Sequence, residues 1–482
     1  MDKTLESTVK TLESTVKITS TVKTTTKLNN QIVFILQQYK QFSAYYYTIF
    51  KTNISINTMS AIVESEPQEK YSPKSPDFPP PGYKADAPPS KTMEWANSII
   101  SSITLRPLEE TDDVFKFTLA GLNVSLANAL RRTVQDDIPA YVFDINKCKI
   151  EVNTGRLHNE ILKHRLQCIP IHSKVIVEDW LENRADHNIF EKYVMDLDVK
   201  NDGEQTIYVT TADFKVKNKT TGRFLAAAEI ERLFPKDKIT NSNVIFARLR
   251  PKISDSMQGE HLKLSCEFTI SNATENSAFT VVCCSAYGNT IDLEEADKAW
   301  ESAELRLREE ATKRGESVDP TEIEFQKKNF QILDRQRHYV KDSFDFNIES
   351  IGVYDTRELC KMSSSILVHH FEKLAEEIET RDDLIHNSET TMENCFDFTL
   401  ERGDYTIGKV LEHSLYEKGF VAKGGKPRLQ FCGFKKMHPH DEHSIIRVSY
   451  LEKEAEKSWF KNDLKESCAD AIAIFKAIRA KF

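Results

Sequence analysis

Glycine is scarce in this sequence, which has 15 glycines among 482 residues. None of the glycine-based signatures G-x-x-x-x-G-K-[ST], G-x-G-x-x-G or G-x-S-x-G occurs. Those patterns cradle phosphates or present a catalytic serine, so nucleotide-binding and serine-hydrolase functions find no support. We therefore expect no catalytic residue and do not predict an enzyme.

Long apolar runs are also lacking, since no stretch approaches the roughly 18 uninterrupted apolar residues that a membrane span requires. The most apolar stretch, 31–50, is interrupted by three internal glutamines and Lys40. It lies too far along the chain to resemble a signal peptide. We expect a soluble, intracellular protein without a membrane partner.

Two further features are missing. The nine cysteines include no C-x-x-C pair and are odd in number, which argues against a disulfide framework and for a reducing compartment.

An excess of positive charge is absent too, because 65 Lys and Arg face 74 Asp and Glu, a net charge of −9. Such a chain has no general attraction to nucleic-acid phosphates, and the balance favours protein partners.

The N-terminal 93 residues have a composition unlike the rest. They begin with KTLESTV repeats that are rich in Ser and Thr, and residues 64–92 carry eight of the 16 prolines. Low complexity and proline disfavour regular structure, so we expect a disordered extension at 1–93. Translation from Met59 instead of Met1 stays open.

The remaining chain alternates between strand and helix patterns. Apolar residues at every second position predict strands, and apolar residues spaced by threes and fours predict helices. Ser125, Thr356 and Thr406 are expected to cap the helices that follow them. The patterns divide the chain into a first α+β domain at 94–172 plus 335–380, a mostly β insert at 173–334, a linker at 381–393 and a second α+β domain at 394–482.

Smaller elements follow from the same patterns. Strands are expected in the insert near 193–199, 206–210, 244–250 and 261–270, and a charged helix near 293–314. Long amphipathic helices close both α+β domains, with apolar stripes along 359–378 and 460–482. We expect two matched units packed helix against helix.

Three segments stand out in order along the first domain. They are 123–139 (NVSLANALRRTVQDDIP), 153–171 (NTGRLHNEILKHRLQCIPI) and 344–352 (FDFNIESIG). Together they resemble the alpha-type subunits of multisubunit RNA polymerases, in particular the third subunit of eukaryotic polymerase II or its archaeal counterpart, archaeal D. The segments 394–408 (NCFDFTLERGDYTIG), 431–434 (FCGF) and His438-Pro439 resemble the smaller partner, the eleventh subunit or archaeal L.

The resemblance implies an α+β fold with two alpha-type dimerisation units packed helix on helix and a mostly β insert in the first. It implies a non-catalytic platform on which the largest and second-largest polymerase subunits assemble with small subunits. Nucleic acid would be contacted only indirectly, and no separate alpha-like partner would be needed. Fusions of this kind are typical of large DNA viruses, which points to host cytoplasm, nucleus or virion.

The resemblance also implies which residues bind partners. Asn128, Arg131 and Arg132 lie on the signature helix that meets the large subunits, where the planar guanidinium fork suits bidentate contacts with carboxylates. Without the surrounding motif, a pair of solvated helix arginines would be the simpler interpretation. The matching positions in the other motifs are Glu160, His164, Arg165, Asp404, Gly408, His438 and Pro439.

One departure and one alternative concern metals. Eukaryotic third subunits carry a four-cysteine zinc loop, whereas the insert has only Cys266, Cys283 and Cys284 without ligand-pair spacing, so we predict no metal and no cofactor. The alternative is a metal-binding hydrolase using the His438–His443 cluster, HPHDEH. The lack of H-E-x-x-H spacing makes a surface turn the favoured interpretation of that cluster.

Overall fold

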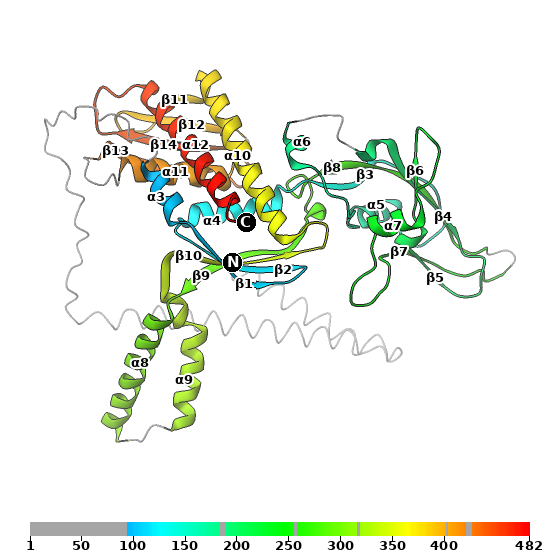
Figure 1. Ribbon diagram of the computed structural model, residues 1–482, viewed down its shortest axis with the longest axis horizontal. Coiled ribbons are helices and arrows are strands. Elements are labelled where there is room, and N and C mark those ends of the chain that lie inside the picture. The colour runs from blue at the N-terminus through cyan, green and yellow to red at the C-terminus, as the bar shows by residue number, and fades with distance from the viewer. Residues whose placement is uncertain (1–93, 183–188, 255–257, 316–318, 402, 421–426) are drawn as a thin grey trace, which may run out of the picture. The chain divides into compact units, whose positions relative to one another are not determined.

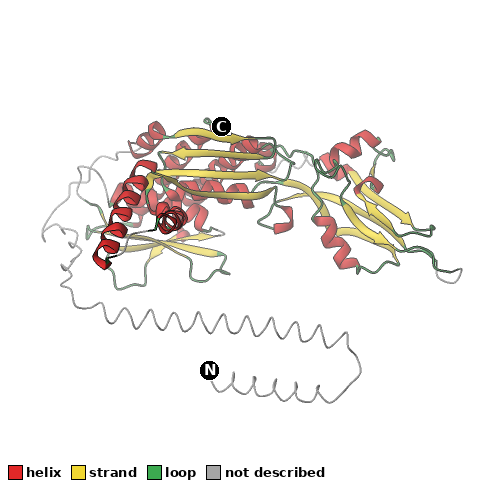
Figure 2. Cartoon of the chain, turned by 90° about the horizontal axis from the view of Figure 1, so that it is seen from below, coloured by secondary structure: helices red, strands yellow, loops and turns green. Residues whose placement is uncertain are grey.

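A computed structural model describes residues 94–182, 189–254, 258–315, 319–401, 403–420 and 427–482 (Figure 1). The N-terminal extension expected at 1–93 lies outside the described residues. Helices and antiparallel sheets make up the described chain, an α+β composition that Figure 2 distinguishes by colour. Buried apolar side chains form two separate clusters, called here the first core and the second core.

The first sheet begins with the mostly exposed strand β1 and with β2, which alternates buried and half-buried residues. In β2 the side chains of Phe115, Phe117 and Leu119 are buried, which matches the period of two in the sequence. Two helices cover this face, and Arg357 stacks on the ring of Phe115 at 4.8 Å. The elements are β1 (Thr104–Glu110), β2 (Val114–Ala120), β10 (Tyr339–Ser350) and β9 (Val282–Ile291) in the sheet order β1-β2-β10-β9, with α4 (Val124–Asp136) and α10 (Thr356–Thr380).

The second sheet has the same connectivity as the first. In each case two consecutive strands are followed in sequence by a helix, then by two more strands, and finally by a long helix. The last of the four strands pairs with the second one, so both lie inside the sheet and the other two form its edges. The elements are β11 (Ile385–Asn387), β12 (Cys395–Glu401), β14 (His443–Tyr450) and β13 (Leu429–Lys435) in the sheet order β11-β12-β14-β13, with α11 (Tyr405–Gly419) and α12 (Lys457–Arg479). The order β1-β2-β10-β9 thus corresponds strand by strand to β11-β12-β14-β13.

The helices of the two sheets pack against one another and share the first core. Helices α10 and α12 lie side by side in Figure 1, and the rings of Phe371 and Phe475 stack between them with centroids 5.9 Å apart. Lys476 pairs with Glu372 at 3.0 Å along the same seam. One continuous core therefore joins the two sheets through their helices.

The second core lies in a strand-rich region between α4 and β9. Six phenylalanines line it, several in ring contact: Phe143, Phe190, Phe214, Phe234, Phe246 and Phe268. Its elements are the sheet β3 (Ala140–Asn153), β8 (His261–Ser271), β4 (Tyr193–Lys200) and β6 (Lys215–Asn218), the pair β5 (Ile207–Thr210) and β7 (Ile245–Leu249), and the helices α5 (Asn159–Gln167) and α7 (Ala227–Leu233). The short helix α6 (Val177–Leu181) leads back toward α10, and Val177 belongs to the first core.

Three more helices and five short 3-10 turns complete the described part of the chain. The hairpin of α8 (Leu293–Arg314) and α9 (Pro320–Ile332) extends from the strands β9 and β10 (Figure 1). Helix α3 (Glu94–Ser102) precedes β1, and Trp95 meets His413 of α11 edge-on at 5.6 Å. The 3-10 turns are η2 (Ile189–Lys192), η3 (Thr211–Asp213), η4 (Ser277–Phe279), η5 (Asp334–Arg337) and η6 (Asp382–Leu384).

The packing differs from the expected domain limits. Strand β3 and helix α5, assigned from sequence to the first domain, contribute to the second core, whereas β9, assigned to the insert, pairs with β10 in the first sheet. The expected linker 381–393 contains η6 and β11, and Leu384 and Ile385 are buried in the first core. Alternating apolar residues reveal a strand but not the sheet that it joins, which is why the limits of 172/173 and 334/335 do not follow the packing.

The helix caps also differ from those expected. The side chains that accept the first amide bonds belong to Asn123, Asp355 and Asp404, not to Ser125, Thr356 and Thr406. Asp and Asn are at least as favourable at this position as Ser and more so than Thr. Each expected hydroxyl residue lies one or two positions inside the helix.

Candidate functional site

Helix α4 carries the arginine pair, and its two arginines have different partners. Leu126, Leu130 and Val134 anchor one side of the helix in the first core. Arg131 Nε donates to Asn128 Oδ1 at 3.0 Å and its Nη1 to Gln135 Oε1 at 2.8 Å, so this guanidinium is held along its own helix. Asn128 and Arg131 are both half-buried.

Arg132 reaches across to the second sheet's first helix. Its Nε donates to Thr406 Oγ1 at 2.9 Å, and its Nη2 forms an ion pair with Asp404. Asp404 is also the N-cap of α11, because its Oδ1 accepts the Thr406 amide at 2.7 Å. A single guanidinium therefore fixes the start of α11 against α4.

The charge of Asp404 is maintained by these contacts. Burial alone would raise the pKa of this carboxyl, but the Thr406 amide and the Arg132 guanidinium together hold the pKa below its usual value. The pair is about one-third exposed, at 29% for the Arg132 side chain and 35% for Asp404, so solvent screens part of the attraction. The contact therefore contributes as much to the placement of α11 against α4 as to stability.

The C-terminal end of α4 is acidic and poorly solvated. Burial raises the pKa of Asp137 to about 6, despite a hydrogen bond that its Oδ1 accepts from the Thr274 hydroxyl at 2.9 Å. Burial also raises the pKa of Asp136, while Arg132 and Arg131 act in the opposite direction. Two carboxyls thus lie beside the arginine pair in an environment that disfavours their charge.

The residues expected on the second motif separate into two groups on α5. Glu160 and His164 are exposed and lie four positions apart, hence on one face of the helix, next to Ile161, whose exposure is 45%. Arg165 instead donates from Nε to the Phe246 carbonyl at 2.7 Å and from Nη2 to the Ile245 carbonyl at 2.9 Å. The structure assigns Arg165 a role in holding β7 and leaves Glu160 and His164 open to a partner.

Gly408 lies where α11 crosses β13. A Cβ atom at this position would lie 2.0 Å from Cε2 of Phe434, so only glycine allows this approach. Glu412 on the same helix accepts the Phe434 amide at 3.0 Å. The expected partner-binding glycine is occupied in packing within the chain.

His438 and Pro439 are exposed in the turn between β13 and β14. The His440 amide donates to His438 Nδ1 at 3.1 Å, and the two imidazole rings are 4.9 Å apart. In the part of the chain that the structure describes, which includes all of 438–443, no three His, Cys, Asp or Glu side chains converge as metal ligands would. The hydrolase alternative therefore has no ligand geometry in the described residues.

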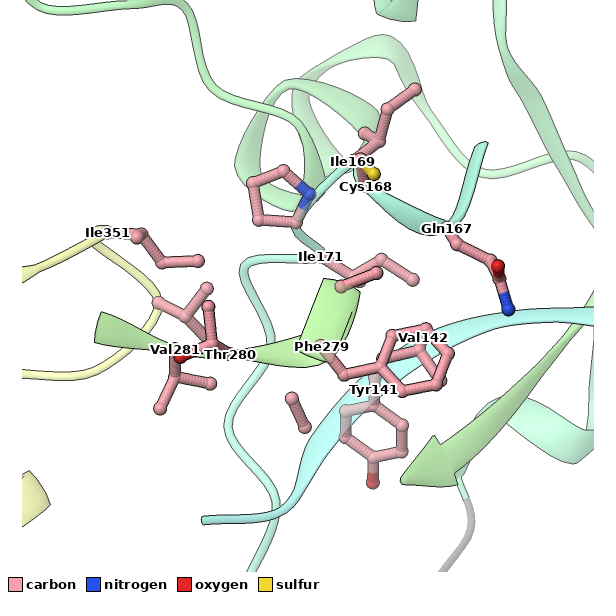
Figure 3. A pocket seen from close by; sticks show the side chains of 14 residues that line it. Tyr141, Val142, Gln167, Cys168, Ile169, Ile171, Phe279, Thr280, Val281 and Ile351 are labelled. Atoms are coloured by element: carbon pink, nitrogen blue, oxygen red, sulfur yellow. The ribbon is translucent and has the colours of Figure 1, made fainter. Parts of the chain in front are cut away.

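A groove of about 180 Å³ lies where the two cores meet (Figure 3). It is lined from one side by the C-terminal end of the second motif and from the other by the segment before β9, and the labelled side chains include Gln167, Ile171 and Phe279. Tyr354 closes the junction nearby, since its hydroxyl donates to the Pro139 carbonyl at 2.7 Å and accepts the Val175 amide at 3.1 Å. Tyr354 carries no local pattern that would reveal this role, because both partners are remote in sequence.

Among the described residues, no helix has both the length and the apolar composition to cross a bilayer.

Contacts between the two sheets' helices continue at their ends, where Lys461 pairs with Asp382 at 2.7 Å and Lys465 pairs with Glu379. Sequence reasoning found the apolar stripes of these helices but not their ion pairs.

Comparisons with known proteins agree on one family. The model of the RNA polymerase Rpb3/Rpb11 dimerisation domain matches residues 116–371. The DNA-directed RNA polymerase subunit Rpo3 of Pyrococcus furiosus is 22% identical over 293 residues, covering 58% of this chain and 98% of that protein. The matched range runs from β2 to α10, so all the elements of the second sheet and its two helices lie beyond it.

Two eukaryotic relatives are also subunits of DNA-directed RNA polymerases. Subunit 3 of DNA-directed RNA polymerases II, IV and V of Arabidopsis thaliana is 42% identical over 72 residues, covering 15% of this chain and 21% of that protein. The subunit rpac1 of DNA-directed RNA polymerases I and III of Dictyostelium discoideum is 22% identical over 301 residues, covering 56% of this chain and 81% of that protein.

Proposed function

Because the chain belongs to the RNA polymerase Rpb3/Rpb11 dimerisation domain family, we propose that it is a non-catalytic assembly subunit of a multisubunit DNA-dependent RNA polymerase. Similarity to polymerase subunits from an archaeon and from eukaryotes supports this assignment. Catalysis then belongs to its partners.

The finer proposal is that one chain holds both alpha-like units. The observation that carries it is the shared connectivity of the two sheets, β1-β2-β10-β9 and β11-β12-β14-β13, each with one helix inside the sequence of strands and one after it. Two copies of a single fold in one polypeptide are the arrangement that a fused third and eleventh subunit would give. No separate alpha-like partner is then needed.

The seam between the units supports a permanent pairing. Ring stacking of Phe371 on Phe475 lies in a continuous apolar core, and Arg132 fixes α4 to the cap of α11. Covalent connection adds an effective concentration that reaches about the millimolar range for short linkers, so pairing becomes intramolecular. Stoichiometry between the units is fixed at one to one.

The docking surface for the two large subunits is proposed on the exposed residues of the family motifs. Glu160, Ile161 and His164 form an open face on α5, and the His438-Pro439 turn provides a second exposed site. Asn128 and Arg131 are half-buried on α4, and Arg131 lies close enough to the acidic end of that helix to act on Asp136. Arg132, Arg165, Asp404 and Gly408 make contacts within the chain and are proposed to act on partners only through the shape that they maintain.

The fused arrangement also favours a large DNA virus as the source. Transcription would then take place inside the host cell, in cytoplasmic factories or the nucleus, or in the virion. The small polymerase subunits would join the same complex, and nucleic acid would be contacted only indirectly.

The decisive experiment is purification of the tagged chain from its native source at moderate salt, followed by mass spectrometry. Recovery of the two largest polymerase subunits near one to one, without a separate small alpha-like protein, supports the fused platform. Recovery of an additional alpha-like subunit at equal stoichiometry contradicts the fusion, and recovery without any large subunit contradicts the platform.

Two matched variants locate the docking face. Ile161→Asp places a charge on the α5 face, while Leu305→Asp makes the same kind of change on α8 at a residue that is 61% exposed. We expect I161D to lose at least ten-fold in recovery of a large subunit and L305D to retain it. Equal recovery with both variants would remove the α5 face from the proposal.

A further inference from the structure

Two thiols lie in the second core. Cys148 on β3 has an exposure of 6% and Cys266 on β8 of 0%, and both are free. Their strands are antiparallel neighbours in one sheet. All nine cysteines of the chain are described and free, so any pairing must form from reduced thiols.

The strand register places the two thiols together. In β3, residues 145–148 form a bulge between two segments that pair with β8. The residues on either side of the bulge, Asp144 and Lys149, pair with Glu267 and Ser265, which are the two neighbours of Cys266 in the sequence. Along β8 every second residue is buried, and Cys266 belongs to that inward series. Cys148 is the buried member of the bulge, so both side chains point into the same core.

The two thiols lie on the same side of the sheet at neighbouring positions. The Cys266 thiol lies 3.3 Å from the carbonyl oxygen of Asp144, the residue at which the bulge begins. The neighbouring Cys266 thiol lowers the pKa of Cys148, and the charge of Lys163 on α5 acts in the same direction against the effect of burial. Cys148 is also the more accessible of the two, with an exposure of 6% beside the exposed Asn146 and Lys147, so it is the thiol that a small oxidant reaches first.

We propose that Cys148 and Cys266 are a redox-modification site that forms an intramolecular disulfide on exposure to hydrogen peroxide. The Cys148 thiolate attacks one peroxide oxygen, the O–O bond breaks, and the departing hydroxide leaves as water after taking the proton released by Cys148. The resulting sulfenic acid is attacked by Cys266, the S–S bond forms, the S–O bond breaks and a second water leaves. Both sulfurs are oxidised and the peroxide is reduced.

The bulge explains how a small oxidant gains access. Asn146 and Lys147 are exposed at its tip, and Lys147 is only loosely held, 3.7 Å from Asp144 and 3.8 Å from Glu267. Brief opening of four residues exposes Cys148 without unfolding the sheet. The disulfide then ties the bulge to β8 and removes this opening.

The test uses the full-length chain. It is treated with a small excess of hydrogen peroxide, remaining thiols are alkylated after denaturation, and a non-reducing digest is mapped by mass spectrometry. We expect a cross-linked peptide joining Cys148 to Cys266 that disappears on reduction with dithiothreitol. Full alkylation of both residues while the exposed Cys168 and Cys283 are oxidised would overturn the proposal, as would a cross-link to any other cysteine.

Two variants separate the roles of the thiols. In Cys266→Ser, Cys148 is expected to accumulate as a sulfenic acid that dimedone traps, at several times the wild-type level. In Cys148→Ser, Cys266 is expected to remain fully alkylatable. If either variant fails to fold by its thermal transition, the wild-type peptide map alone decides between a reactive pair and two inert core thiols.

Discussion

The ring of Phe482 packs edge-on against the ring of Phe117, with 5.2 Å between centroids and 82° between planes. Phe117 lies on β2 in the first sheet, whereas Phe482 follows α12, the long helix of the second. The core beneath one sheet is therefore completed by a side chain that belongs to the other. Each of the two sheets therefore depends on the other for a complete core.

Phe482→Ala should lower the free energy of unfolding by about 1–2 kcal/mol, since the ring is partly buried and loses aromatic contacts with Phe117 and Phe115. Denaturant titration measures the change. The control is Phe325→Ala on α9, which removes the same side chain at 60% exposure and should cost no more than about 0.5 kcal/mol. Equal losses would show that Phe482 contributes nothing specific.

The contact between Arg132 and Asp404 should appear as a coupling energy. Arg132→Ala, Asp404→Ala and the double variant form a cycle, and we expect a coupling of about 1 kcal/mol because the pair is only about two-thirds shielded from solvent. Arg131→Ala with Asp404→Ala is the matched cycle, since the Arg131 side chain bonds along its own helix. That second cycle should be close to additive, and a coupling as large as the first would contradict the assignment.

Gly408→Ala should be costly and Gly288→Ala should not. The added methyl at Gly408 meets the Phe434 ring and forces α11 away from β13, at a cost of about 1–3 kcal/mol. At Gly288 in β9 no heavy atom lies within 4 Å of the position that a Cβ would occupy, so the same substitution has room. Thermal unfolding of the two variants distinguishes them; a neutral G408A would mean that the helix shifts freely.

Asp137 should make stability depend on pH. The carboxyl loses its proton near pH 4 when unfolded and at about 6 when folded, so the folded state is favoured below this window and loses stability as the pH rises through it. Asp137→Asn should therefore be more stable than wild type above pH 6, by at most about 3 kcal/mol, and the advantage should vanish near pH 4. A difference that does not change with pH would contradict this.

His370 titrates over much of the same range with the opposite sign. Burial lowers its pKa to about 4, so its contribution to stability is present at neutral pH and is lost as the pH falls below about 6.5. The measurement should accordingly be taken as the difference between D137N and wild type, in which the contribution of His370 cancels.

The sequence was informative where an apolar stripe faces a core. Helices α4, α10 and α12 and strands β2 and β12 follow their apolar spacing, because burial decides which residues can occupy those positions. Helix α9 was missed, and none of its residues is buried, so it has no stripe to detect. Strand β6 has four residues and a single buried side chain, Val216, too little for an alternating pattern.

The candidate site was only partly accessible from sequence. The motif around Arg132 could be recognised, but its partner Asp404 lies 272 positions away and no local pattern couples them. Arg165 and Gly408 match motif positions, yet Arg165 is bonded to the backbone of β7 and Gly408 is buried against Phe434. Only three-dimensional packing distinguishes such residues from ones without these contacts, such as Glu160. Domain limits failed for the same reason, since strand partners are a property of the fold.

The hairpin α8–α9 has a consequence for protein engineering. Its ends are held together by β9 and β10, which are neighbours in the first sheet, and the Asp292 amide donates to the His338 carbonyl at 3.0 Å at the base. The whole excursion can therefore be shortened to a tight turn, or exchanged for a fluorescent or affinity module with closely spaced termini, without altering the strand register beneath it. This makes the α8–α9 hairpin a natural place to graft labels that must not disturb the seam between the two sheets.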